Sequence, residues 1–184
     1  MKIDLIAGRL YEPAVPDGFV REALWSEPIS VLARAEHPIL RGPVSVDEMR
    51  RYELVLPTVT QRVGREIEHL LSLLGIDPVS SLRSSSYALI RELLHGTDML
   101  AVMPRLMMVG DLLRRTLRVV PLPLPTPERP AGLVLPRNGS LTAAGNSFVA
   151  CLRTYVAEIA ASGIDADITG GDSHAGRSDK TTPG

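Results

Sequence analysis

The sequence has few cysteines, few aromatic side chains and no excess of charge of either sign. Its single cysteine, Cys151, excludes an internal disulfide and fits a reducing cytoplasm. Aromatic residues make up only 4% of the 184 residues, so few side chains are available to stack on bases or sugars. The 20 basic and 21 acidic residues give a formal charge of −1, whereas a free-standing nucleic-acid binder normally has a clear basic excess.

The chain also lacks the segments that would place it in a membrane or mark it for export. No apolar run reaches the length of a membrane span, and Asp4 interrupts the apolar stretch that a signal peptide needs. Hydrophobic residues nevertheless make up 45% of the chain, which is enough to form a core. We therefore expect a cytoplasmic α/β protein built as one domain or as two small lobes, with no membrane partner.

Motifs for nucleotides, metals and catalysis are missing too. There is no GxGxxG or GxxxxGK[ST] run, so we expect no nucleotide cofactor. The histidines at 37, 69, 95 and 174 are far apart and have no cysteine or paired carboxylates beside them, which argues against a metal site. Cys151 is better interpreted as a small hydrophobe of a helix than as a nucleophile. The sequence therefore predicts no enzyme, no cofactor and no metal.

Short apolar runs alternate with amphipathic stretches along most of the chain. This alternation predicts a mostly parallel sheet with βαβ crossovers. Capping residues precede the amphipathic stretches, as in Ser45-Val46-Asp47-Glu48, which is a capping-box pattern. The polar, glycine-rich residues 164–184 have no periodicity and predict a disordered tail. Strands are expected at 3–7, 27–34, 54–56, 99–103, 117–122 and 131–135, and helices after Ser45, after Thr58–Gln61, at Ser84–Ser86, at Pro104 and from Thr142.

Hydroxyl-rich helix starts are the strongest local signal for a binding site. Thr58 and Thr60 follow the strand at 54–56, with Gln61 and Arg62 in the first helical turn, and Ser84–Ser86 begin the next helix. In open α/β sheets, ligands collect outside the carboxyl ends of strands, where free backbone N–H groups and the helix dipole favour anions. The alternative is that each hydroxyl only caps its helix. Arg9, at the end of the first strand, either joins such an anion site or is a surface cation.

An ordered series of short motifs covers nearly all of residues 1–162. The motifs are IDLIAGRL (3–10), EP (27–28), HPIL (37–40), LVLP (54–57), MLAVMP (99–104), VPLP (120–123) and LT (141–142), followed by Phe148 and Leu152-Arg153. This series resembles the C-terminal effector-binding part of a LysR-type transcriptional regulator. Its start, together with the serine-rich segment 83–87, is most similar to the branch that senses aromatic-catabolism intermediates or sugar acids.

The resemblance implies a type 2 periplasmic-binding-protein-like α/β fold with two lobes of mixed, mostly parallel sheets. Residues 1–24 and 130–163 would form lobe I and residues 25–129 lobe II. The family's winged helix-turn-helix and the first strands and helices of lobe I have no counterpart in this sequence. We therefore expect an incomplete first lobe, a truncated regulator whose Met1 is an internal start, and DNA contact only through the missing N-terminal domain.

The function implied by the resemblance is ligand sensing: a small organic acid binds in the interlobe cleft and thereby controls transcription. The helix at 60–74 matches one that packs in the family's dimer, which implies a homo-oligomer. A solute-binding protein of the same fold and a small α/β enzyme using the same cleft are the alternatives. The matched effector-contacting positions are Arg9, Thr58, Thr60, Gln61, Arg62, Val63, Ser84, Ser85, Ser86 and Met103.

Overall fold

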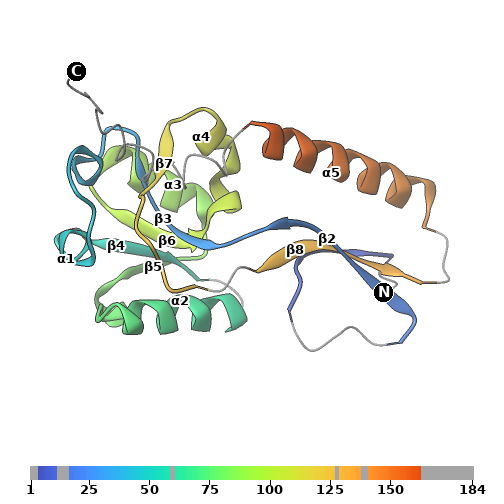
Figure 1. The fold of residues 1–184 in the computed structure, drawn as a ribbon, viewed down its shortest axis with the longest axis horizontal. Coiled ribbons are helices and arrows are strands. Elements are labelled where there is room, and N and C mark those ends of the chain that lie inside the picture. The colour runs from blue at the N-terminus through green and yellow to red at the C-terminus, as the bar shows by residue number, and fades with distance from the viewer. Residues whose placement is uncertain (1–3, 12–16, 59–60, 127–128, 138–140, 163–184) are drawn as a thin grey trace, which may run out of the picture.

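The computed structural model describes residues 4–11, 17–58, 61–126, 129–137 and 141–162. Their strands form two sheets, which lie side by side and are joined by two extended crossings (Figure 1). The larger sheet has the order β5-β4-β6-β3-β7, with β3 at Ile29–Arg34, β4 at Leu54–Pro57, β5 at Leu82–Ser84, β6 at Leu100–Pro104 and β7 at Leu117–Val119. The smaller has the order β1-β8-β2, with β1 at Ile6–Arg9, β2 at Phe19–Ser26 and β8 at Pro130–Pro136.

The larger sheet is mixed, as expected, but only the two pairings of β4 are parallel, so the expectation of mostly parallel pairing was wrong. Strand β4 pairs in parallel with both β5 and β6, while β3 runs antiparallel to both β6 and β7, so four of its five strands share one direction. The smaller sheet is antiparallel throughout, because the returning strand β8 lies between β1 and β2. The chain between β2 and β8 forms the whole of the larger sheet and its helices, so the smaller sheet closes only when the chain returns from that body.

Helices cover both faces of the larger sheet (Figure 1). Helix α2 lies on one face and α3 and α4 on the other, whereas α5 extends beside the smaller sheet. Local signals set several ends: Ser45 Oγ accepts from the N–H of Glu48 at 3.1 Å, and Gly75, at φ +65°, ends α2. The helices are α1 (Val46–Met49), α2 (Gln61–Leu73), α3 (Tyr87–Gly96), α4 (Val109–Leu113) and α5 (Ala143–Ala161), with 3-10 turns at Pro38–Arg41, Pro78–Ser80 and Arg105–Met108.

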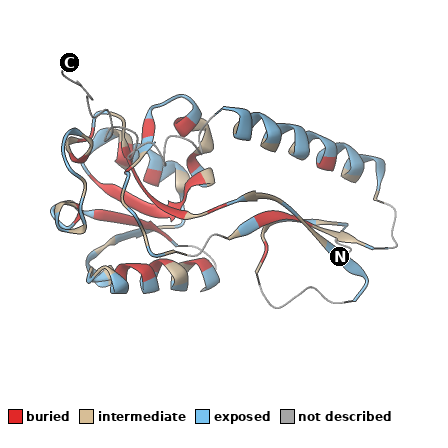
Figure 2. Cartoon of the chain, in the orientation of Figure 1, coloured by how far each residue is buried: buried red, intermediate tan, exposed pale blue. Residues whose placement is uncertain are grey.

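The core has two halves, one on each face of the larger sheet. In β3, Val31 packs toward the α2 side, whereas its neighbour Leu32 packs with Ile90 and Leu94 of α3. Strands β4 and β6 alternate in the same way, as the period of two in a strand requires. Figure 2 shows the buried residues concentrated in this body, while most of the visible surface of α5 is exposed. The larger sheet with its helices is therefore the folding core of the chain.

Three elements differ from the sequence-based expectation. Strands β2 and β5 were not predicted: β2 has no simple alternation, and β5 is only three residues long. Strand β2 is held by pairing with β8 along its length, with a bulge between Ala23 and Trp25. Gly132 is required opposite that bulge, because a Cβ there would lie 1.9 Å from the carbonyl oxygen of Glu22. Pro104, expected at the first position of a helix, is the last residue of β6 and the N-cap of the 3-10 turn at Arg105–Met108, which leads into α4.

An ion pair ties helix α5 to the smaller sheet. Arg153 forms a two-pronged ion pair with Glu22 of β2, with N–O distances of 2.9 and 2.7 Å. Phe148 and Tyr155 of α5 are exposed, as is Ile6 of β1. The apolar faces of the final helix and of the first strand are thus partly uncovered. The tail predicted at 164–184 lies outside the described residues.

The two leucines at positions 71 and 73 offer a matched test of the α2 packing. Leu71 has no exposed surface, whereas Leu73 on the same helix is 58% exposed. We expect Leu71→Ala to lower the free energy of unfolding by about 2–5 kcal/mol, because it leaves a cavity, and Leu73→Ala by less than about 0.5 kcal/mol. Urea denaturation of both variants measures this, and equal losses would contradict the packing described.

Candidate functional site

The carboxyl ends of three parallel strands meet at one edge of the larger sheet. Pro57 at the end of β4 lies in register with Ser84 at the end of β5, and the N–H of Thr58 donates to the carbonyl oxygen of Ser84 at 2.7 Å. Strand β6 runs in the same direction and ends at Pro104. The structure therefore brings together the two hydroxyl-rich segments that the sequence predicted as an anion site.

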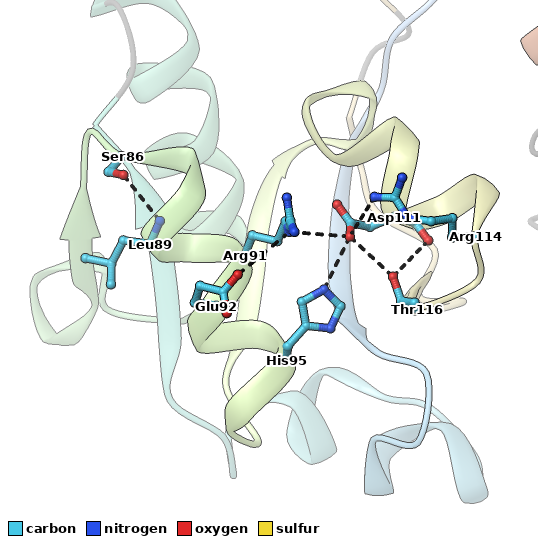
Figure 3. Close-up of polar contacts among 8 residues, drawn as sticks. All are labelled: Ser86, Leu89, Arg91, Glu92, His95, Asp111, Arg114 and Thr116. Carbon is cyan, nitrogen blue, oxygen red and sulfur yellow. Dashed lines mark hydrogen bonds and ion pairs between the residues drawn. The ribbon is translucent and has the colours of Figure 1, made fainter.

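Some of these hydroxyls are engaged in local structure. Ser86 Oγ accepts from the N–H of Leu89 at 3.2 Å and so caps α3, as Figure 3 shows. Ser84 Oγ accepts from the N–H of Ser86 at 3.0 Å. Thr58 and Ser85 are exposed at the same edge. The capping interpretation therefore applies to Ser86, while Thr58 and Ser85 are exposed residues at this edge.

Arg9 lies buried between the two sheets. Its side chain is only 7% exposed, so the interpretation as a surface cation is wrong. Its Nη1 donates to Glu66 Oε2 of α2 at 3.0 Å, and its Nη2 donates to the backbone oxygen of Glu27 at 3.0 Å. The other carboxylate oxygen of Glu66 pairs with Arg129 Nε at 3.0 Å. One carboxylate on the larger body thus holds an arginine from β1 and an arginine that precedes β8.

The chain passes between the sheets at two hydrogen-bonded crossings. The N–H of Glu27 donates to the carbonyl oxygen of Arg129 at 2.8 Å, and the N–H of Leu10 donates to that of Pro130 at 2.8 Å. Burial raises the pKa of the Glu27 carboxyl, although the charges of Arg9 and Arg105 oppose the rise. Sequence reasoning did not select Glu27 as a site residue. The sequence feature that could have indicated Glu27 is its carboxylate directly before the apolar run of β3, because a charged side chain is rarely buried there.

The remaining predicted residues have different surroundings. The guanidinium of Arg62 lies 5.3 Å from the ring centre of Tyr11, a cation–π contact. Val63 is 8% exposed and packs in the core half on the α2 side. Met103 has no exposed surface and packs on the α3 side, because its position on β6 points it to that face. Thr60 and the side chain of Gln61 lie outside the described residues.

Comparison with known proteins decides the family. The sequence pattern of the LysR substrate binding domain matches residues 2–157. This chain belongs to the LysR substrate-binding domain family. A curated relative, the HTH-type transcriptional regulator PcaQ of Agrobacterium fabrum, is 28% identical over 135 residues, which cover 72% of this chain and 43% of the relative. The chain spans about two fifths of the length of the curated relatives that it matches.

Solved structures share the fold of this LysR substrate-binding domain. The regulatory domain of CcmR from Synechocystis PCC6803, solved with 2-PG, aligns with a TM-score of 0.58 at 15% identity, covering 83% of this chain and 73% of that one. The effector binding domain of QuiR, solved with shikimate, aligns with a TM-score of 0.56 at 15% identity, covering 84% and 71%. The fold is thus the periplasmic-binding-protein-like α/β fold of LysR effector domains.

Within the described residues of this LysR domain, no group of three or more His, Cys, Asp or Glu side chains could hold a metal ion. No helix in the described ranges is long and apolar enough to cross a membrane. The curated relatives are transcriptional regulators rather than enzymes. The family match makes this chain an effector-binding domain of the LysR type.

A second polar cluster of this LysR domain stabilises the helices behind the strand-end edge. Asp111 of α4, 6% exposed, accepts from His95 Nε2, Arg114 Nη2 and Thr116 Oγ1, each at 3.3 Å (Figure 3). Arg91 Nε lies 3.5 Å from the same oxygen. Burial alone would raise the pKa of Asp111, but the hydrogen bonds from His95 and Arg114 outweigh it, and the pKa lies below its usual value. Asp111 thus joins α3 to α4 as an ionised acceptor.

An apolar cavity of about 320 Å³ lies between β2, the turn after β6, and α5. Its walls are mainly the side chains of Trp25, Leu106, Val109, Leu152 and Tyr155. Arg105 and Ser26 are polar residues on its lining, and they also lie close to the crossing at Glu27. Of the two exposed aromatic side chains of α5, Tyr155 lines this cavity and Phe148 does not.

Asp111 provides a test of pH-dependent stability. Its pKa is lowered in the folded state, so its contribution is present above the unfolded pKa, about 4, and is lost as the pH falls through the lower folded pKa. We expect Asp111→Asn to lower the free energy of unfolding by about 1–3 kcal/mol at pH 7 and by much less at pH 3. Urea denaturation at the two pH values measures the difference.

The matched control is Asp47→Asn, because the Asp47 side chain is 87% exposed in its ion pair with Arg50. This change should cost less than about 1 kcal/mol at either pH. A loss for Asp111→Asn that is the same at pH 3 as at pH 7 would contradict an ionised Asp111.

Proposed function

We propose that this domain senses a small organic anion at the strand-end edge and thereby controls transcription through the DNA-binding part of a larger regulator. The Arg9–Glu66 ion pair is the observation that carries this proposal. It joins the smaller sheet to α2 directly beside the two crossings. A ligand that competes for this arginine acts on the contact that holds the two parts together.

An anionic effector engages Arg9 by taking the place of the Glu66 carboxylate. The N–H groups of a guanidinium can donate to any carboxylate that lies in the right position. When Arg9 binds the ligand, Glu66 keeps its ion pair with Arg129. Hydroxyls and backbone N–H groups at the starts of α2 and α3 supply further donors. The contacts proposed are Arg9, Thr58, Thr60, Gln61, Arg62, Ser84, Ser85 and Ser86, while Val63 and Met103 shape the site from within the core.

Signalling follows from a shift between open and closed arrangements of two lobes. We assign residues 1–24 and 130–163 to lobe I and residues 25–129 to lobe II, with the hinge at the Glu27–Arg129 backbone hydrogen bond. A ligand shifts this equilibrium only by its difference in affinity for the two arrangements, and no reaction on the effector is needed. A solute-binding protein or an enzyme is not favoured, since the curated relatives regulate transcription.

Two further features of the proposal follow from the relatives and from the surface. Shikimate, the ligand solved with QuiR, is a hydroxylated cyclic carboxylate, which supports an aromatic-catabolism intermediate or a sugar acid as effector. Exposed apolar side chains at the end of α2 and in the turn after it, Leu73 and Val79, support homo-oligomer formation through the helix at 60–74. A regulator that acts on DNA in this way works in the cytoplasm.

Isothermal titration calorimetry with shikimate, benzoate and gluconate tests the sensing role. We expect one of these classes of acid to bind, and Arg9→Gln to weaken that binding about ten-fold or more, because a charged hydrogen-bond donor is lost. Glu66→Gln should instead strengthen binding, because Arg9 no longer has a competing carboxylate. This second variant keeps the test decisive if Arg9→Gln fails to fold.

Glu68→Gln is the matched control for Glu66→Gln. Glu68 lies on the same helix but pairs at the surface with Arg83, at 2.8 Å. It should leave effector affinity unchanged. The proposal is wrong if no acid of the three classes binds, or if Glu66→Gln and Glu68→Gln change the affinity equally.

A further inference from the structure

The apolar cavity between β2 and α5, called the α5 cavity below, has three walls from different parts of the chain. Its volume of about 320 Å³ is at the lower end of the range of small-molecule sites. The third wall belongs to the larger body, where the turn after β6 leads into α4, and Figure 1 shows one end of α5 beside α4. Among the described residues that line the cavity, none belongs to the effector site proposed above.

One side of α5 supplies much of the apolar surface of this cavity. Leu152, Tyr155, Val156 and Ile159 all line it. Their spacing of three and four positions places them on one face of the helix. All four keep surface that is accessible to water. A ligand that covers this face therefore removes apolar surface from water, which favours binding.

The walls of the α5 cavity suit a neutral ligand better than an ion. Arg105 is the only charged residue among the described residues of the lining, and it is 5% exposed. Its charge acts on the nearby Glu27 carboxyl, where it opposes the rise in pKa that burial causes. An ion would lose its hydration on entering such apolar surroundings, at a large cost in free energy.

Two of the few aromatic side chains of the protein line the α5 cavity. Trp25 is the single tryptophan of the chain, and Tyr155 is one of four tyrosines. Aromatic rings attract one another in offset-stacked and edge-to-face arrangements, in addition to the burial of their surface. The lining therefore fits an aromatic ring in particular.

The Trp25 indole carries a hydrogen-bond donor that the protein does not satisfy. Within the described residues, its Nε1 is buried and has no acceptor. A buried donor without a partner costs free energy. Because the Trp25 side chain borders the cavity, it has room to turn its N–H toward a molecule bound there. An acceptor oxygen on that molecule then gives Nε1 a partner.

We propose that the α5 cavity binds a small neutral aromatic molecule with one hydrogen-bond acceptor, such as an aryl ketone. The ring of the ligand lies against the apolar face of α5, and its oxygen accepts from Trp25 Nε1. Since β2 and α5 form two walls and the turn after β6 forms the third, the bound molecule contacts both parts of the chain. This site differs from the effector site in its lining and in the charge of its ligand.

Acetophenone and ethylbenzene are matched probes for this proposal, because they differ only in the carbonyl oxygen. The single tryptophan gives one indole N–H resonance in a nitrogen–proton correlation spectrum. We expect millimolar acetophenone to move this resonance downfield to a saturating value, as a new hydrogen bond does. Trp25→Phe should weaken acetophenone about five-fold, through loss of one hydrogen bond, and ethylbenzene by less than about two-fold, both measured by ligand-observed NMR titration. Equal weakening of both probes would overturn the proposed ligand chemistry.

Val156→Asp and Ala157→Asp form a matched pair of variants on α5. Val156 lines the cavity, whereas Ala157 is exposed and does not. A carboxylate at position 156 should weaken both probes about ten-fold or more, since it brings a charge into apolar walls. Ala157→Asp should change both affinities by less than about two-fold. Equal effects of the two variants would overturn the proposal, and Trp25→Phe keeps it testable if Val156→Asp fails to fold.

The remaining outcomes separate this cavity from the effector site. Val156→Asp should leave the binding of the organic acids unchanged, and a saturating organic acid should not displace acetophenone. If the acid displaces acetophenone and Val156→Asp has no effect on it, acetophenone occupies the effector site and the cavity proposal is wrong. If neither probe binds, the cavity is a packing surface for another protein segment and the proposal is also wrong. If acetophenone binds as described but no organic acid binds, only the effector proposal fails.

Discussion

The shared carboxylate of Glu66 is the interaction on which the arrangement of the two sheets depends. It accepts from Arg9 of β1 and pairs with Arg129, which directly precedes β8. A buried guanidinium is costly unless it is paired and hydrogen-bonded, and Arg9 is paired with Glu66 of α2 and hydrogen-bonded to the backbone oxygen of Glu27 at the crossing. The pair therefore specifies how β1 lies against the larger body, whatever its net contribution to stability.

The same arginine lies close to the edge proposed for ligand binding. Arg9 Nη2 donates to the backbone oxygen of Glu27, two residues before Ile29, which is in register with Pro104 at the end of β6. The contact between the two sheets and the proposed effector site therefore share one guanidinium group. If a ligand takes Arg9 from Glu66, that carboxylate keeps its ion pair with Arg129.

Local sequence patterns predicted the elements that depend on local chemistry. The Ser45 cap, the end of α2 at Gly75 and the Ser86 cap each use a side chain or glycine within a few residues of the backbone groups that it serves. The buried runs of β4 and β6 were predicted because both faces of these strands are covered. Strand β2 was missed, because its partner β8 lies more than a hundred residues away in the sequence.

The sequence by itself determined the alternation of strands and helices, the hydroxyls at the strand ends and, through its ordered motifs, the family. Only the tertiary structure decided which of the predicted site residues share an environment. It buried Met103 in the core, because the register of β6 points that side chain toward α3, and it turned Arg9 from a candidate surface cation into the partner of Glu66. Pairings across 57 residues, such as Arg9 with Glu66, leave no local signal, since they arise only when packing brings distant segments together.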